Sequence, residues 1–474
     1  MSAAIPAPPR RSRESLAGEV RTTTILAAPL VAGHVSTGLI GFVDNVLAGH
    51  HGTDTLAGVA IGTALFWLPV VVPMGTLRAL PPTVSQLDGA GRRGEIGAVF
   101  RQALWLAAML GMLMFAFMTV VVHALGPMGI APEIIPGATA FLHGIRWGVP
   151  ALTLFYCMRY LSEGLHWTLP TMVLSAGGLL VLLPLGYVLT FGRLGAPEMG
   201  AAGLGLASAV MLWMQMLGFL VVLWRSRRFA DLQLFARFDP PRWTMIRRLL
   251  ATGLPIGVTV LMEGGLFIAA ALLIGRLDGV SAAAHQIAVN VATLCFMVPM
   301  GLAEATTVRV GHAMGRDDRD GVRRAAYAGY AIVLGTQLVS ALTLALGNEW
   351  VVGFYTTDAA VAALAASLLL YAAAFQFPDG VQVLSAGALR GLKDTRVPML
   401  LAGLAYWGVG MPLGAVLSLG WGGFTPAMGP KGMWMGLIAG LSVAAVLLGL
   451  RFHRSSDPAR LLVRSLRARV TNGG

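Results

Sequence analysis

The sequence predicts an all-α integral membrane protein with twelve transmembrane helices, arranged as two six-helix lobes related by pseudo-two-fold symmetry. The first observation behind this prediction is composition: 12% of residues are charged and 56% are hydrophobic, whereas an average soluble chain has about 25% charged residues. The length of 474 residues accommodates about twelve spans of ~20 residues joined by short connections.

The second observation is an internal repeat, in which proline and glycine positions of the first half recur in the second half. The matched pairs include Pro29 with Pro255 and Gly49 with Gly275, separated by 226, and Pro150 with Pro378, separated by 228. Six spans in each half give both halves the same orientation, an architecture in which transporters place a binding site between the repeats.

The third observation is that basic residues gather on alternate connections between the predicted spans. The basic set includes Arg92, Arg93, Arg101, Arg225, Arg227, Arg228, Arg237, Arg242, Arg247, Arg248, Arg309, Arg316, Arg319, Arg323, Arg324, Arg390, Lys393 and Arg396. Lys and Arg mark the cytoplasmic loops of membrane proteins, so we expect both termini to be cytoplasmic in a bacterial inner (plasma) membrane. The net charge of +12 then reflects topology and predicts no nucleic-acid partner.

In chain order, residues 1–22 are predicted to be a cytoplasmic tail and residues 23–224 the first lobe. The spans expected in this lobe are 23–49, 55–80, 99–125, 136–160, 168–192 and 200–224. A basic linker, 225–248, leads to the second lobe, 249–452, and to a basic cytoplasmic tail, 453–474. The spans expected in the second lobe are 249–275, 280–305, 324–346, 359–385, 396–420 and 431–452.

Three carboxylates fall near the middle of predicted spans: Asp44, Glu263 and Asp379. An ionisable group at that depth is costly and marks a functional site by default. Burial favours the neutral acid and a bound cation favours the ionised form, so such a group can take up a coupling ion on one side and release it on the other. Asp379 follows Pro378, which removes a backbone hydrogen bond and frees carbonyl oxygens that can help to hold Na+ or a proton.

Other polar and aromatic residues are candidates for contacts to substrate in a cavity. Phe375 precedes Asp379 by one helical turn, where its ring can attract a cation. Gln286, Asn290 and Gln382 are further candidates. For these amides, hydrogen bonding between helices is an equally good interpretation.

Two charge pairs are expected to have structural roles. Arg159 and Glu163 have the i, i+4 spacing of an ion pair within one helix. Glu304 is expected near Arg309 at the membrane interface. There is no P-loop and no metal-ligand spacing in the sequence, so we predict a protein that is not an enzyme and has no cofactor, with Na+ or H+ as the coupling ion.

At the level of motifs, the sequence resembles the multidrug and toxic compound extrusion (MATE) transporters, especially their NorM-like branch. The matching stretches are FVDNVLAG at 42–49, PPTVSQLDGAGRRGEI at 81–96, LPIGVTVLMEGGLF at 254–267, AAHQIAVN at 283–290, RVGHAMG at 309–315 and FQFPDGVQVLSAGALRGLKDT at 375–395. They spread over essentially the whole chain.

This resemblance implies two lobes that open as a V and export of lipophilic or cationic drugs driven by Na+ or H+. It implies that Glu263 and Asp379 form the coupling-ion site of the second lobe, with Na+ as one candidate ion, and that Asp44 is the acid of the first lobe. Leu183 stands where many members have Asn, which weakens an ion site in the first lobe. The partners expected are small lipophilic or cationic molecules and the lipid bilayer, with the protein acting as a monomer.

Two alternative functions remain open at this stage. A flippase for lipid-linked oligosaccharide, from the same superfamily, needs a basic cavity that holds pyrophosphate. An intramembrane enzyme acting on lipids needs a nucleophile or metal cluster at an interface. The sequence favours neither, because acids dominate the predicted mid-membrane charges and no such cluster is evident.

Overall fold

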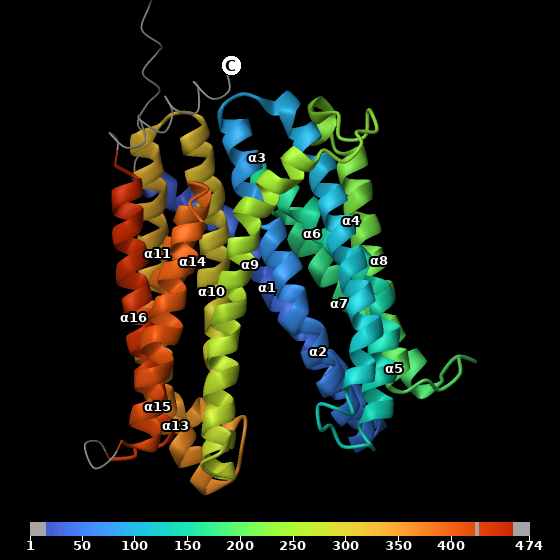
Figure 1. The fold of residues 1–474 in the computed structure, drawn as a ribbon, viewed down its shortest axis with the longest axis vertical. Helices are drawn as coiled ribbons and strands as arrows, with labels where there is room; N and C mark the ends of the chain where they lie inside the picture. Colours follow the sequence, from blue (N-terminus) through green and yellow to red (C-terminus); the bar gives the residue numbers. More distant parts are fainter. Residues whose placement is uncertain (1–15, 422–425, 458–474) are drawn as a thin grey trace, which may run out of the picture.

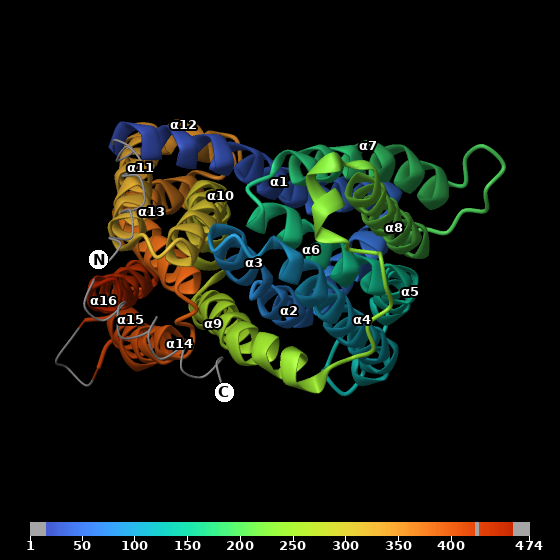
Figure 2. The same ribbon diagram turned by 90° about the horizontal axis from the view of Figure 1, so that it is seen from above.

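The computed structural model describes residues 16–421 and 426–457, which form two bundles of helices (Figures 1 and 2). The first bundle contains α1 (Leu16–His51), α2 (Thr53–Leu77), α3 (Leu80–Gly89), α4 (Ile96–Val121), α5 (Ile135–Ile145), α6 (Val149–Gly164), α7 (Leu169–Phe191) and α8 (Ala201–Arg225). The second contains α9 (Trp243–Gly275), α10 (Gly279–Gly315), α11 (Arg319–Leu346), α12 (Asn348–Gly353), α13 (Ala359–Gly391), α14 (Arg396–Gly403), α15 (Met411–Leu419) and α16 (Pro430–Ser455).

The described residues confirm the prediction of twelve spans. Eleven helical segments are long and apolar enough to cross a bilayer. The remaining span consists of α5 and α6, separated by a 3-10 turn at Arg146–Gly148, with Pro150 in the first turn of α6. At a rise of 1.5 Å per residue these two helices are about 16 Å and about 24 Å long, so together they cross the bilayer as one broken span.

Helices extend beyond the apolar stretches that mark them in the sequence. Helix α1 begins at Leu16, within the range expected to be a tail, and α16 continues to Ser455. The connection between the bundles covers only 226–242, because α9 begins at Trp243 and includes basic residues before its apolar part. Hydropathy therefore locates the membrane-buried part of a helix and not its ends.

The connection between the bundles is fastened to α4. Arg101 Nε lies 2.6 Å from Asp239 Oδ2, and the indole of Trp105 donates to the Asp239 carbonyl at 3.0 Å. The hydrogen bond from Arg101 holds the pKa of Asp239 below its usual range. The linker thus lies against the first bundle.

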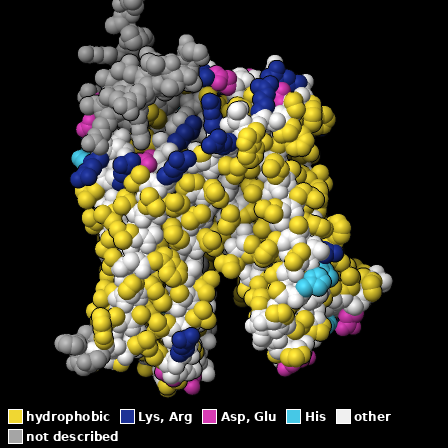
Figure 3. Space-filling model, viewed as in Figure 1, with side chains coloured by type: hydrophobic (Ala, Val, Ile, Leu, Met, Phe, Trp, Pro, Cys, Tyr) yellow, Lys and Arg dark blue, Asp and Glu magenta, His cyan; other side chains and the backbone are white. Residues whose placement is uncertain are grey.

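The two bundles meet at one end and separate at the other (Figure 1). Contacts between them are made by α2 with α9, by α3 with α10 and by α1 with α10. Lys and Arg side chains gather at the end where the bundles meet, at the top of Figure 3, and the opposite end is open between the two lobes. The protein is therefore closed at its basic end.

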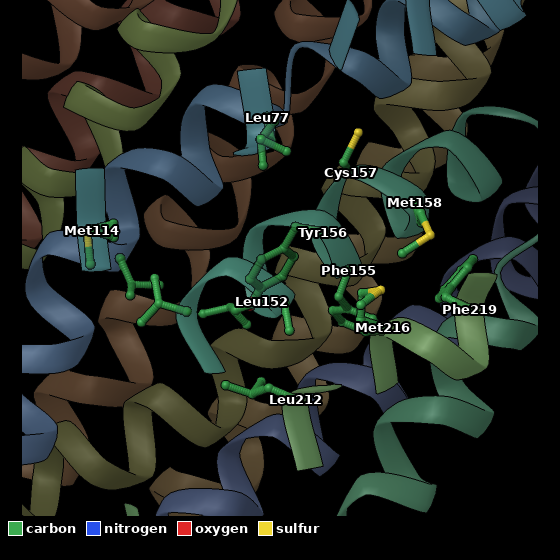
Figure 4. Packing of buried hydrophobic residues seen from close by; sticks show 14 of the residues in the cluster. Leu77, Met114, Leu152, Phe155, Tyr156, Cys157, Met158, Leu212, Met216 and Phe219 are labelled. Carbon is green, nitrogen blue, oxygen red and sulfur yellow. The ribbon is translucent and has the colours of Figure 1, made fainter. Parts of the chain in front are cut away.

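The first bundle has a continuous apolar core (Figure 4). Leu152, Phe155 and Tyr156 of α6 pack with Leu212 and Phe219 of α8 in this core. Lipid tails are as apolar as these side chains, so close packing stabilises the bundle more than exclusion of water does.

Glycines allow α2 and α9 to approach closely where the two bundles meet. A Cβ atom added to Gly75 would fall inside the contact distance of the Gly257 backbone, and one added to Gly257 would lie 2.9 Å from the carbonyl oxygen of Val72. The obstructing atoms belong to backbone and cannot rotate away. Closure of this end therefore requires small residues on both helices.

We expect Gly257→Val to weaken closure of the basic end. Overpacking costs about 1–3 kcal/mol, so the ratio of closed to open protein should fall about tenfold or more. The shift is measured as faster modification of a cysteine placed at the α2–α9 crossing. Gly275→Val is the matched control, because nothing lies within 4 Å of a Cβ at that glycine of the same helix. Equal modification of the two variants would contradict the prediction.

Candidate functional site

The amide of Gln382 joins the acids predicted for the second lobe. Its Nε2 donates to Glu263 Oε1 at 2.9 Å, which connects α13 to α9. Its Oε1 accepts a hydrogen bond from the hydroxyl of Tyr406 at 2.9 Å. Asp379 precedes Gln382 by three residues on α13 and interacts with both Gln382 and Glu263. The structure thus places Glu263 and Asp379 in one hydrogen-bonded network.

The two carboxylates of this network differ in how far they are exposed to the neighbouring cavity. Asp379 is 3% exposed and Gln382 is 2% exposed. Glu263 is only partly buried and lines a cavity of about 710 Å³. The cavity wall beside it includes Phe296 and Met300. A cation that enters the cavity therefore meets Glu263 first and Asp379 behind the amide of Gln382.

The backbone around the network is irregular at two places. Pro378 lies inside α13, and residues Leu404–Gly410 between α14 and α15 form a π-helix. A π turn holds an extra residue and is frequent at functional sites. Tyr406 belongs to this turn, and its side chain is fully buried. Sequence reasoning missed Tyr406, and the glycines at 403, 408 and 410 are the only local signal of the irregular turn.

The network has more acidic charge than its hydrogen bonds neutralise. Gln382 is neutral, and Tyr406 donates to Gln382 rather than to a carboxylate. Two carboxylates within interaction distance in a low-dielectric site resist simultaneous ionisation, unless a proton or a cation lies between them. The oxygen atoms of Glu263 and Asp379 are hard donors of the type that cations such as Na+ prefer. The arrangement can therefore take up one positive charge and release it.

Asp44 lies in a separate cavity inside the first lobe. It is 5% exposed, lies beside Ser208, and has one carboxylate oxygen buried without a hydrogen-bond partner. Its cavity, of about 620 Å³, is lined also by Thr63 and Ser175. Leu183 is 54% exposed and does not line this cavity. The hydroxyl groups of Thr63, Ser175 and Ser208 make the wall of this cavity polar. The presence of Leu183 in the sequence did not predict this polarity.

The remaining predicted contacts do not join the Glu263 network. Phe375 is 2% exposed and packs between Phe267 and Trp434, at ring-centroid distances of 6.0 Å and 5.6 Å. Gln286 and Asn290 are exposed on α10, and neither lines the cavity that contains Glu263. Of the four predicted cavity contacts, the structure brings only Gln382 to the acids.

A second charged cluster was not predicted, and it connects the two lobes through Glu304. This residue of α10 lies 2.8 Å from His34 Nε2 on α1 and 3.0 Å from Arg78 Nη2, next to α2. Arg159 of α6 lies 3.6 Å from it and also pairs with Glu163 at 2.6 Å, which confirms the expected i, i+4 pair. One buried carboxylate of the second lobe is thus held by three basic side chains of the first.

Glu304 and Arg309, which lie five positions apart on α10, have different ion-pair partners. Glu304 is buried between the lobes, and Arg309 pairs instead with Glu19 of α1. The cavity beside the cluster, of about 880 Å³, is lined by His34, Arg78 and Arg159. This cavity and the one beside Glu263 share wall residues, which are Met74, Arg78, Phe296 and Met300. The cluster therefore closes the basic end directly beside the space that Glu263 faces.

Comparison with known proteins gives consistent matches over nearly the whole chain. The family model MatE matches residues 29–188 and 255–416. A probable multidrug resistance protein NorM of Xanthomonas campestris pv. campestris is 68% identical over 440 residues, covering 93% of this chain and 95% of that protein. The multidrug resistance protein PmpM of Pseudomonas aeruginosa is 42% identical over 454 residues, covering 95% and 94%.

Solved structures show the same fold at low sequence identity. The crystal structure of the eukaryotic MATE transporter AtDTX14 matches with a TM-score of 0.83 at 19% identity, covering 94% of this chain and 99% of that one. An outward-facing multidrug resistance MATE family transporter of the MOP superfamily matches with a TM-score of 0.84 at 17% identity, covering 92% and 96%.

Proposed function

The chain belongs to the MatE family as a NorM-like transporter, and from this premise we propose that it exports lipophilic, cationic drugs in exchange for Na+ or H+. The relatives that align with this chain over almost their whole length are named multidrug resistance proteins. These names support drug extrusion as the activity. The hydrogen-bonded network of Glu263, Gln382 and Asp379 is the proposed coupling-ion site.

The observation that carries this proposal is the position of Glu263. Its carboxylate lines a cavity whose wall includes Met74, Phe296 and Met300. It is also hydrogen-bonded to Gln382, the residue that interacts with Asp379. Flexible methionines suit substrates of varied shape. A lipophilic cation in this cavity and a coupling ion at the network draw on the same negative charge, so binding of one lowers the affinity for the other.

The two-lobed shape supports an alternating-access cycle. We propose that the basic end is cytoplasmic, in accord with the distribution of Lys and Arg in Figure 3, so that the structure represents an outward-open state. The coupling ion then binds from outside and displaces the drug. The lobes close outside and part inside, and the ion leaves so that a new drug molecule can bind. Each chain contains both cavities, which supports action as a monomer.

Transport of ethidium by inside-out membrane vesicles tests the proposed function. In such vesicles the exporter moves drug into the lumen, so the lumen is given either high Na+ or low pH. We expect one gradient to drive accumulation, and Asp379→Asn to lose it. Glu349→Gln is the matched control, because Glu349 is an exposed acid on α12. Accumulation that Asp379→Asn leaves intact would contradict the assignment.

The same assay addresses the flippase alternative. Arg78 and Arg390 also line the cavity of Glu263, but Arg78 is paired with Glu304. Failure of both gradients to move ethidium and a second cationic dye, in well-folded protein, would count against drug export. Flipping of a fluorescent lipid-linked oligosaccharide by the same preparation would then favour the flippase.

A further inference from the structure

Three potential metal ligands meet where the two lobes touch at the basic end: Asp88, His166 and His312. Asp88 lies in α3 and His166 in the connection between α6 and α7, both in the first lobe, whereas His312 lies in α10 of the second lobe. One ligand atom of each side chain lies within 4.8 Å of the ligand atoms of the other two. They are separate from the proposed coupling site, and no step of the transport cycle above uses them.

The contacts among these residues leave donor atoms available. His312 Nδ1 lies 3.3 Å from Asp88 Oδ2, while the other oxygen of Asp88 pairs with Arg93. The rings of His166 and His312 are nearly perpendicular, with centroids 4.8 Å apart. The Nε2 atom of His166 is buried and has no hydrogen-bond partner. A buried polar atom of this kind calls for a ligand or an ion to satisfy it.

Two imidazole nitrogens and one carboxylate oxygen form a donor set that suits first-row divalent metals. Zn²⁺ binds His nitrogen at about 2.0–2.1 Å and carboxylate oxygen at about 2.0–2.2 Å, and a site with three protein ligands keeps a fourth position for water. The three ligand atoms, which lie within 4.8 Å of one another, move closer together when an ion binds between them. We propose that Asp88, His166 and His312 form a binding site for a divalent transition-metal ion, Zn²⁺ in preference to Mg²⁺ or Ca²⁺.

The position of the site gives the ion a mechanical consequence. Helix α3 and helix α10 are already in close contact there, because a Cβ at Gly89 would overlap the carbonyl of His312 and one at Gly315 would overlap the carbonyl of Gln86. An ion held by residues of both lobes ties them together only in this closed arrangement. Since binding to one state shifts the population toward it, bound metal holds the basic end closed and stops turnover. This consequence rests on the proposed transport cycle, whereas metal binding itself does not.

Direct binding to the purified full-length chain tests the site without any transport assay. Zn²⁺ is titrated against a chromogenic chelator, and Co²⁺ serves as a spectroscopic probe of nitrogen and oxygen ligation. We expect one site per chain, and affinity reduced at least about tenfold in His166→Ala and His312→Ala, since loss of even outer-shell partners weakens metal sites by about that factor. His143→Ala, at an exposed histidine in α5, is the matched control.

Asp88→Asn and His312→Gln provide conservative second variants if an alanine variant does not fold. Absence of Zn²⁺ binding by the wild type, or equal affinity of the wild type and folded triad variants, would overturn the metal site. Affinity that falls only in the triad variants would support it.

Spin labels placed on α3 and α10 test the coupling between lobes. In the wild type, Zn²⁺ should narrow the distribution of distances between the two labels to the value of the closed state. In His312→Gln, Zn²⁺ should leave this distribution unchanged. The same distribution with and without saturating Zn²⁺ would overturn the claim that the ion holds the lobes together.

Ethidium transport by the same variants separates this inference from the proposed function. Zn²⁺ should inhibit the wild type and spare His312→Gln, which retains transport without metal. A wild type that binds Zn²⁺ but moves no dye under any gradient counts against drug export alone and leaves the metal site supported. Full transport at saturating Zn²⁺ would overturn the inhibitory role.

Discussion

Glu263→Gln should reduce ion-driven efflux about 100-fold or more while leaving the protein folded. The substitution preserves the size of the side chain and removes the charge that faces the cavity. Leaving a buried charge without its partner costs about 3–5 kcal/mol, and each 1.4 kcal/mol is a tenfold change in affinity. Both the coupling ion and a cationic drug lose the carboxylate that faces the cavity, so ion coupling and drug binding are both weakened.

Initial rates of ethidium accumulation in inside-out vesicles measure this effect, with expression and thermal unfolding of the purified variants as checks on folding. Glu349→Gln, the same change at an exposed acid, should keep the wild-type rate. Coupled transport by Glu263→Gln within a few-fold of the wild type would show that the drug and the ion do not depend on this carboxylate.

Glu304→Gln should open the basic end of the molecule. Glu304 holds His34 and Arg78 across the lobe interface at 2.8 Å and 3.0 Å, and without it the buried guanidinium of Arg78 has no ion-pair partner within the described residues. The cost of about 3–5 kcal/mol for removing one member of a buried pair corresponds to a shift of about 100-fold or more between the closed and open states. We therefore expect transport to fall because the outward-open state is no longer stable.

Distances between spin labels across the basic end measure this shift directly. Glu95→Gln is the control, because Glu95 pairs with Arg92 at 2.6 Å on the exposed surface, where ion pairs contribute little. Adding Arg78→Gln to Glu304→Gln should restore part of the closed population, since removing both partners costs less than removing one. A Glu304→Gln variant that stays closed would show that the glycine contacts hold this end by themselves.

The sequence was sufficient for the architecture because membrane constraints are local. A span is a run of ~20 apolar residues, and the positions of Pro and Gly repeat between the halves. The acids Glu263 and Asp379 were visible because charge is rare at that depth. What the sequence could not indicate is that Gln382 joins the two, since a polar residue in a span can equally well bridge helices.

The role of Glu304 depends on contacts between distant positions. Its partners His34 and Arg159 are 270 and 145 positions away, so no helical spacing relates them, and proximity in sequence pointed to Arg309 instead. Tyr406 donates a hydrogen bond to Gln382 from a π turn that the nearby glycines indicate only weakly. In both cases the site depends on how whole helices are placed against one another.

Competition between ion and drug is most directly measured by binding of a fluorescent lipophilic cation to the purified protein while Na+ or H+ is titrated. In the wild type, one of the two ions should weaken cation binding in proportion to its own occupancy. In Asp379→Asn, the affinity for the fluorescent cation should not change with the concentration of this coupling ion. The ion that does not couple should have no effect on cation affinity in either protein. Cation affinity of the wild type that stays constant while the coupling ion saturates its site would contradict competition for one negative charge.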